Sequence, residues 1–167
     1  MSSVWPRIKD LRVTLIAAGI ITFFLCQRHV GFMIYLQVFI LIPWIIGSAW
    51  KIIVNSKIRW LQTAKILIWL LSVAIIAGSH YFLASRTRAR AQEIVNAIAA
   101  YHATHGVYPE SEYLESIGYT KDKIRSMVGM GGYLIENDKP SFFYASTYII
   151  FETDSYNFNT RQWEHRN

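Results

Sequence analysis

The sequence predicts three membrane-spanning helices followed by a small α+β domain, in which a long helix packs on an antiparallel sheet. Three observations predict this fold class. Residues 1–83 carry three long apolar runs separated by short polar segments. Residues 84–105 show the spacing of an amphipathic helix. From Tyr133 onward the composition changes to aromatic and β-branched residues, which are typical of strands.

These patterns divide the chain into three parts. Residues 1–65 are expected to form two N-terminal transmembrane helices and a cytoplasmic connector. Residues 66–105 are expected to form a third transmembrane helix that continues as an amphipathic helix. Residues 106–167 are expected to form an α+β domain outside the membrane. An unbroken second part would couple the membrane segment rigidly to the outer domain.

The net charge of +6 lies entirely in the first half of the chain. Residues 1–90 hold eleven Lys and Arg against one acidic residue, Asp10, whereas residues 91–167 hold six basic and ten acidic residues, a net of −4. A nucleic-acid-binding protein carries its basic excess on the exposed domain. The distribution therefore argues against nucleic acid as a partner, and membrane topology accounts for the basic residues.

The first apolar run, Leu11–Cys26, is about 16 residues long, or roughly 24 Å as a helix. No small-residue cleavage site follows it, so we interpret it as a span and not as a signal peptide. Val30–Val54 is the second span and Ile66–Leu83 the third. Cys26 is the only cysteine, which excludes an intramolecular disulfide.

Lys and Arg set the expected topology. The N-terminus and the connector Asn55–Lys65, counted with Lys51, hold seven of them, against four on the opposite side. The positive-inside rule places the N-terminus and the connector in the cytoplasm and Arg86–Asn167 outside.

The amphipathic helix shows one regular face. Its inward positions recur at spacings of three and four: Ala91, Ile94, Val95, Ile98, Tyr101 and His105. Its outward positions include Arg88, Glu93, Asn96 and His102. The helix is predicted to end at His105, with Gly106 as the C′ residue.

A short helix is expected from Pro109 to Ile117 and a helical turn over Thr120–Met127. A flexible connection then follows at Gly129, Gly131 and Gly132. Four short strands are predicted at Tyr133–Glu136, Ser141–Ala145, Tyr148–Glu152 and Ser155–Phe158. The turns between them are expected at 137–140, 153–154 and 159–161, and the chain then returns to Trp163. One face of this sheet should pack on Ile94, Ile98 and Tyr101.

A resemblance supports this arrangement. Ala99-Ala100-Tyr101, Gly106-Val107-Tyr108-Pro109 and Leu114 resemble the stretch that follows the membrane helix in type IV pilins and type II secretion pseudopilins. The resemblance covers residues 66–167 and implies a long helix that ends before a small antiparallel sheet.

The chain also departs from that family. Two extra spans precede the pilin-like helix, and the run that begins at Ile66 has neither the prepilin cleavage glycine nor the following Glu. The resemblance therefore implies a pilin-like scaffold used as a periplasmic domain. It places the chain as a multi-pass protein in a bacterial inner membrane, and not as a processed, polymerising pilin.

Candidate chemistry is sparse. His102 and His105, at i and i+3, have a spacing that can share a metal, but two ligands are not a site. The carboxylates Glu136, Asp138, Glu152 and Asp154 fall at predicted turns and strand ends, where solvated acids are ordinary. His80 near the end of the third span is a candidate proton relay without an acidic partner in the spans. We expect no enzyme activity, no catalytic residues, no cofactor and no metal.

Recognition of a protein partner, through the outer domain or through the small-residue faces of the spans, is the remaining function class, together with contact to membrane lipid. The sheet is rich in aromatic and acidic residues, and such aromatics are enriched at interfaces. The candidate partner-binding residues are Tyr144, Tyr148, Glu152, Asp154, Tyr156 and Trp163. Two hypotheses remain: an immunity protein that neutralises a membrane- or periplasm-acting toxin, or an accessory component of a type IV pilus or secretion assembly.

Overall fold

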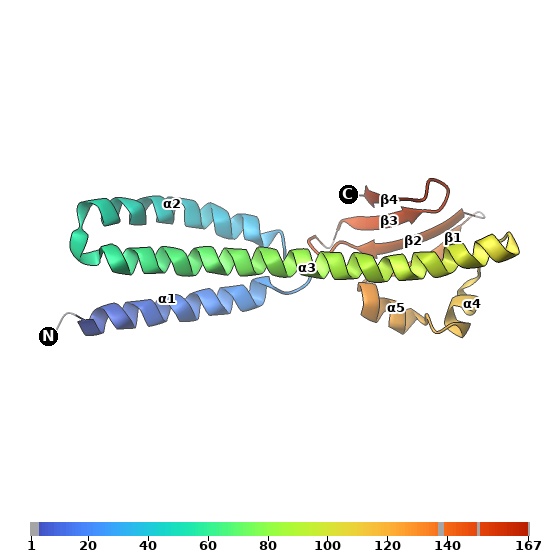
Figure 1. The fold of residues 1–167 in the computed structure, drawn as a ribbon, viewed down its shortest axis with the longest axis horizontal. Helices are drawn as coiled ribbons and strands as arrows, with labels where there is room; N and C mark the ends of the chain where they lie inside the picture. The colour runs from blue at the N-terminus through green and yellow to red at the C-terminus, as the bar shows by residue number, and fades with distance from the viewer. Residues whose placement is uncertain (1–3, 137–138, 150, 167) are drawn as a thin grey trace. The chain divides into compact units, whose positions relative to one another are not determined.

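The computed structural model describes residues 4–136, 139–149 and 151–166, with side chains from Lys9 onward. It is mostly helical and contains one four-stranded antiparallel sheet. The chain divides into two compact units, residues 1–81 and residues 82–167. Figure 1 shows the helices and strands of each unit.

The first unit contains helix α1 (Val4–Leu25), helix α2 (Met33–Val54), the 3₁₀ turn η1 (Ser56–Ile58) and the first part of helix α3 (Arg59–His105). Small and branched side chains lie buried between the helices: Ala18, Leu41, Leu61 and Ile76.

Polar side chains also join the three helices of this unit. The Ser72 hydroxyl on α3 lies 2.7 Å from that of Thr22 on α1 and accepts a hydrogen bond from the Gln37 amide on α2 at 3.4 Å. In a bilayer, apolar side chains contact lipid as favourably as they contact another helix. Hydrogen bonds between helices therefore contribute to their association.

Two helical segments among the described residues are long and apolar enough to cross a membrane, α2 and the segment from Ser56 to His105. Only 17% of each apolar window is buried inside the protein, unlike the core helix of a soluble protein. The prediction of three such helices was wrong for α1. Its start carries Lys9, Asp10 and Arg12, so its apolar run is shorter than the roughly 20 residues that span a bilayer.

Helix α3 is continuous over 47 residues. It begins at Arg59, not at Ile66, so seven of the eleven residues of the predicted connector are α-helical. The Asn55 side chain accepts a bond from the Lys57 N–H and opens the short turn before it. The helix ends at His105 as predicted, and Gly106 adopts φ +73°, a conformation that favours glycine.

The second unit pairs the remainder of α3 with the sheet. Its strands are β1 (Gly131–Glu136), β2 (Lys139–Ala145), β3 (Thr153–Asn157) and β4 (Gln162–Arg166), in the order β1-β2-β3-β4. One register row crosses all four strands and consists of aromatic residues: Tyr133, Phe142, Tyr156 and Trp163. This row faces the helix, because all four rings lie in or against the core that contains Ile94 and Ile98.

The predicted inward face of α3 is largely confirmed. Ala91, Ile94, Val95 and Ile98 are each at most 1% exposed. His105 is the exception and is exposed. The short helices α4 (Ser111–Ser116) and α5 (Lys121–Val128) complete the core with Leu114, Ile124 and Val128.

The third strand is where the strand prediction was wrong. Among the described residues, Tyr148, Ile149, Phe151 and Glu152 form a connection and not a strand, while Ile150 lies outside the description. The Ser146 hydroxyl accepts a bond from the Tyr148 N–H and starts this turn. Strand propensity depends strongly on context, so Tyr148 and Ile149 suit a strand without forming one.

Two turn predictions also change. The expected turn at 153–154 is the start of β3. Of the turn expected at 137–140, Lys139 and Pro140 belong to β2, and residues 137–138 lie outside the description. The turn at 159–161 is confirmed. Gly131 and Gly132 are strand residues and not a flexible connection.

Candidate partner-binding site

Four of the six predicted partner-binding residues lie on the helix-facing side of the sheet: Asp154 and three aromatic residues. Tyr144 is only 3% exposed and belongs to the core. Tyr156 and Trp163 are half-buried, and their ring centroids lie 5.2 Å apart in an edge-to-face contact. Aromatic pairs in this geometry contribute to stability beyond their buried area. These three residues therefore pack the domain, and little of their surface is available to a partner.

Helix α3 covers Trp163 with two side chains one turn apart. The Arg88 guanidinium lies 3.9 Å from the ring centroid, a cation–π contact. The indole N–H donates to the Gln92 side-chain oxygen at 2.9 Å. Arg88 also forms a side-chain hydrogen bond with Tyr144. Arg88, predicted to lie nearer water, is thus half-buried between helix and sheet.

The two acidic residues contact a histidine that was not among the predicted site residues. His165 on β4 is the register partner of Asp154 on β3. Its Nδ1 lies 3.0 Å from Asp154, and its Nε2 lies 3.4 Å from Glu152. The imidazole therefore bridges two carboxylates at the end of the sheet, and its side chain is 50% exposed.

This arrangement shifts two pKa values. The hydrogen bond from His165 to Asp154, with the charges of both carboxylates, raises the pKa of His165 above its ordinary 6.5. Burial raises the pKa of Tyr144, while its hydrogen bond to Arg88 acts in the opposite direction. Near neutral pH, His165 is thus the group that changes the charge of this part of the surface.

The geometry supports recognition more readily than catalysis. Both carboxylates are engaged by His165, so they do not form a free acid–base pair. Both imidazole nitrogens face carboxylates, so neither has a lone pair directed at a metal. Among the described residues, no group of three or more His, Cys, Asp and Glu is arranged to hold a metal ion. A partially exposed, anionic His–carboxylate cluster can bind a cationic group of a partner.

The other candidates lie apart from this cluster. Glu136 is at the opposite end of the sheet, where it pairs with Lys139, and Asp138 lies outside the description. Tyr148 is half-buried on the β2–β3 connection, next to the acidic end of the sheet. Phe151 on the same connection is 86% exposed and was not selected from the sequence.

The two histidines near the end of α3 do not act together. His102 stacks on Tyr108 and His105 on Tyr101, each with ring centroids 4.0 Å apart. His105 Nδ1 also donates to the Tyr101 carbonyl at 3.1 Å, within the last helical turn. Each ring is held by a different tyrosine, so the pair does not present a shared metal site.

His80 has a structural partner. It is fully buried, and its Nε2 donates to the Leu25 carbonyl at 2.7 Å. Leu25 is the last residue of α1, where helix carbonyls lack partners of their own. His80 thus binds the C-terminal end of a neighbouring helix.

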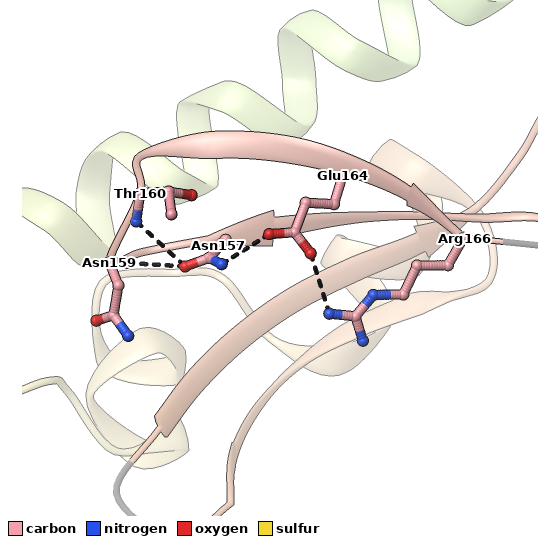
Figure 2. Close-up of polar contacts among 5 residues, drawn as sticks. All are labelled: Asn157, Asn159, Thr160, Glu164 and Arg166. Atoms are coloured by element: carbon pink, nitrogen blue, oxygen red, sulfur yellow. Dashed lines mark hydrogen bonds and ion pairs between the residues drawn. The ribbon is translucent and has the colours of Figure 1, made fainter.

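A second polar cluster fixes the β3–β4 hairpin on the face of the sheet away from α3 (Figure 2). The Asn157 side-chain oxygen accepts bonds from the backbone N–H groups of Asn159 and Thr160. Its amide donates to Glu164 at 2.7 Å, and Arg166 donates to the other oxygen of Glu164 at 3.1 Å. The bonds from Asn157 and Arg166 lower the pKa of Glu164. This chain of bonds sets the register that brings His165 opposite Asp154.

The missed histidine depends on the exact length of the β3–β4 turn. The four-residue turn 158–161 aligns Asn157 with Gln162, and hence Asp154 with His165, whereas the expected three-residue turn at 159–161 would have placed Arg166 opposite Asp154. The contribution of Arg88 had no comparable signal, because its contact with Trp163 joins residues that are distant in sequence.

The chain was compared with protein-family models, with curated proteins and with solved structures, and none of the three comparisons found a match. The candidate site therefore rests on its own geometry.

Proposed function

We propose that the chain is a non-catalytic, multi-pass membrane protein of the bacterial inner membrane that binds a protein partner through its folded domain. The observation that carries this proposal is the change of surroundings along α3. Its N-terminal part belongs to a segment with an apolar window that is only 17% buried. Its later residues, such as Ile94 and Ile98, are completely buried in the domain. A bilayer would cover the first part and leave the domain outside.

Two features support a protein as the partner. Glu152, Asp154 and His165 form a partly exposed cluster at one end of the sheet, in which the imidazole contacts both carboxylates. The second unit, residues 82–167, holds nine basic and ten acidic residues, and two of the acidic residues lie together at this end of the sheet, which favours a basic group on the partner. Tyr148 lies on the β2–β3 connection that leads to Glu152 and is a candidate aromatic contact for the partner.

The leading form of the proposal is an immunity protein that neutralises a toxin acting at the membrane or in the periplasm. A small membrane-anchored chain without catalytic groups suits this role, because protection requires only binding. The positive-inside rule places the basic residues between α2 and α3 in the cytoplasm, and the domain that follows α3 in the periplasm.

One observation favours a second candidate, an accessory component of a type IV pilus or secretion assembly. The four-stranded antiparallel sheet packs on the end of a long helix, as the resemblance to pilins implies. Within the Gly106–Pro109 segment, Tyr108 stacks on His102 and Pro109 is buried.

Affinity purification of the tagged, detergent-solubilised chain from its native host, followed by mass spectrometry, tests both forms. The double variant Glu152→Gln, Asp154→Asn should lose the partner. The control Glu112→Gln, Glu115→Gln removes the same charge from exposed positions on α4 and should retain it.

Recovery of one toxin-like protein, with toxicity to the host when the gene is deleted, would support the immunity role. Recovery of pilins, a secretin or an assembly ATPase would overturn that role in favour of the accessory one. Partner binding that is unchanged in the double variant would exclude the acidic cluster as the binding surface.

A further inference from the structure

The apolar part of α3 ends inside the second unit. Phe82 is 61% exposed, and Leu83 is the last residue of the apolar run. Arg86 is exposed, and its guanidinium lies 5.3 Å from the Phe82 ring centroid. An aromatic residue followed by arginine is typical of the membrane–water interface. If α3 crosses a bilayer, the bilayer surface is therefore at Phe82–Arg86.

The β2–β3 connection lies beside the same stretch of α3. Tyr144, near the end of β2, forms a hydrogen bond with Arg88, which is about 9 Å along the helix from Phe82. The connection closes on itself because the Ser146 N–H donates to the Glu152 carbonyl at 2.8 Å. The β2–β3 connection is thus held near the part of α3 where the apolar run ends.

Two large apolar side chains are exposed at this end of the domain. Phe151, on the connection, is 86% exposed. Met130 is 51% exposed, and its carbonyl accepts a bond from the N–H of Ala145, the last residue of β2. Arg90 on α3 donates to the carbonyl of Met127, near the end of α5, and so holds the end of α5 against the same part of α3.

We propose that this basal surface, formed by Phe82, Arg86, Met130 and Phe151, rests on the lipid bilayer. Phe151 and Met130 would enter the headgroup region, and Arg86 would lie against lipid phosphates. The inference rests on the proposed membrane insertion of α3. It goes beyond that proposal because it assigns a second, non-helical membrane contact that fixes the orientation of the domain.

A lipid surface fits this patch better than a protein does. The patch is continuous with the helix segment that the bilayer covers. Its exposed cation is complementary to anionic headgroups. Apolar aromatic side chains beside arginine are the composition that interfacial contacts use.

Site-directed spin labelling of the full chain in liposomes tests the proposal. In a Cys26→Ala background, single nitroxide labels are placed by Phe151→Cys, Val107→Cys and Leu70→Cys. Val107 is a matched control, because it is 60% exposed but follows the opposite end of α3. Leu70 lies in the apolar segment and reports insertion of the helix itself. The liposomes contain phosphatidylcholine with a minority of phosphatidylglycerol, and the probes are molecular oxygen and a water-soluble nickel chelate.

The label at 151 should be accessible to oxygen and protected from nickel, with an oxygen-to-nickel ratio several-fold higher than at 107. A lipid-facing label at 70 with a water-exposed label at 151 would overturn the basal contact and leave the spanning helix intact. A water-exposed label at 70 would overturn both. A label at 151 protected from both probes would indicate a second copy of the chain and would also overturn the lipid contact.

Discussion

Trp163 on β4 donates its indole N–H to the side-chain oxygen of Gln92 on α3, 71 residues earlier in the chain. Arg88 lies over the same ring. The edge strand of the sheet is thus fixed to the helix by one directed bond and one cation–π contact. The acidic cluster depends on this attachment, because His165 lies two residues beyond Trp163 on the same strand.

The first prediction concerns this bond. Trp163→Phe keeps an aromatic ring under Arg88 but leaves the Gln92 side chain without its donor. We expect the domain to lose about 1 kcal/mol of unfolding free energy. Thermal unfolding of the detergent-solubilised chain, followed by near-ultraviolet circular dichroism, measures the change. Trp60→Phe is the control, since Trp60 is 70% exposed at the start of α3, and it should leave the transition unchanged.

The second prediction concerns pH. The pKa of His165 is raised in the folded protein, so the folded state binds its proton more tightly than the unfolded state does. Its stabilising contribution is therefore fully present below the ordinary pKa of 6.5 and is lost as the pH rises through the raised value. The stability difference between the native chain and His165→Gln should shrink over that interval.

A nuclear magnetic resonance titration of labelled histidine measures the same pKa directly. Asp154→Asn should lower it more than Glu152→Gln does, because the bond to Asp154 is the largest cause of the shift. Equal effects of the two variants would contradict the geometry at this cluster.

The sequence predicted local features better than non-local ones. The spacing of Ala91, Ile94, Val95 and Ile98 predicted the buried face of α3, because a helical face is defined within a few residues. The third strand was misplaced, because its position depends on which residues lie opposite Phe142. Tyr156 is the residue that lies opposite Phe142, and with this register Tyr148 falls in the connection before β3.

The candidate site shows the same limit. Asp154 and Glu152 were selected as acidic residues of a surface, and both are partly exposed. Tyr144 was selected with them, although the helix covers it almost completely. Composition identifies an aromatic sheet, but only the strand register tells which rings face the helix. The contact of Arg88 with Trp163 depends on that register as well.

The third prediction concerns the helices of the first unit. Ser72 interacts with both Thr22 and Gln37, so Ser72→Ala removes the polar link between three helices. Interhelical bonds of this kind contribute about 0.6 kcal/mol on average in membrane proteins. Unfolding in mixed detergent micelles should show a loss of that order. Ser79→Ala, a half-buried serine two turns later on α3, should have a smaller effect.

The last prediction concerns the two adjacent glycines at the start of β1. A Cβ on Gly131 would collide with the Phe143 carbonyl oxygen and would lie 2.8 Å from the Tyr144 Cα. A Cβ on Gly132 would meet nothing within 4 Å. Both residues are in the same strand, so they differ in the space around the missing side chain and not in secondary structure.

Gly131→Ala should therefore cost about 1–3 kcal/mol, the usual range for inserting a group into a filled space. Gly132→Ala should be close to neutral, because the added methyl group has room and the unfolded chain loses some freedom. Limited proteolysis of the two purified variants compares their sheets directly.

Gly131→Ala should also affect His165. The added methyl group would displace Tyr144, which lies opposite Asp154, and a displaced Asp154 would interact less with His165. The pKa of His165 should therefore fall toward its ordinary value. Equal protease resistance of the two variants would show that β1 and β2 do not approach each other as closely as this register requires.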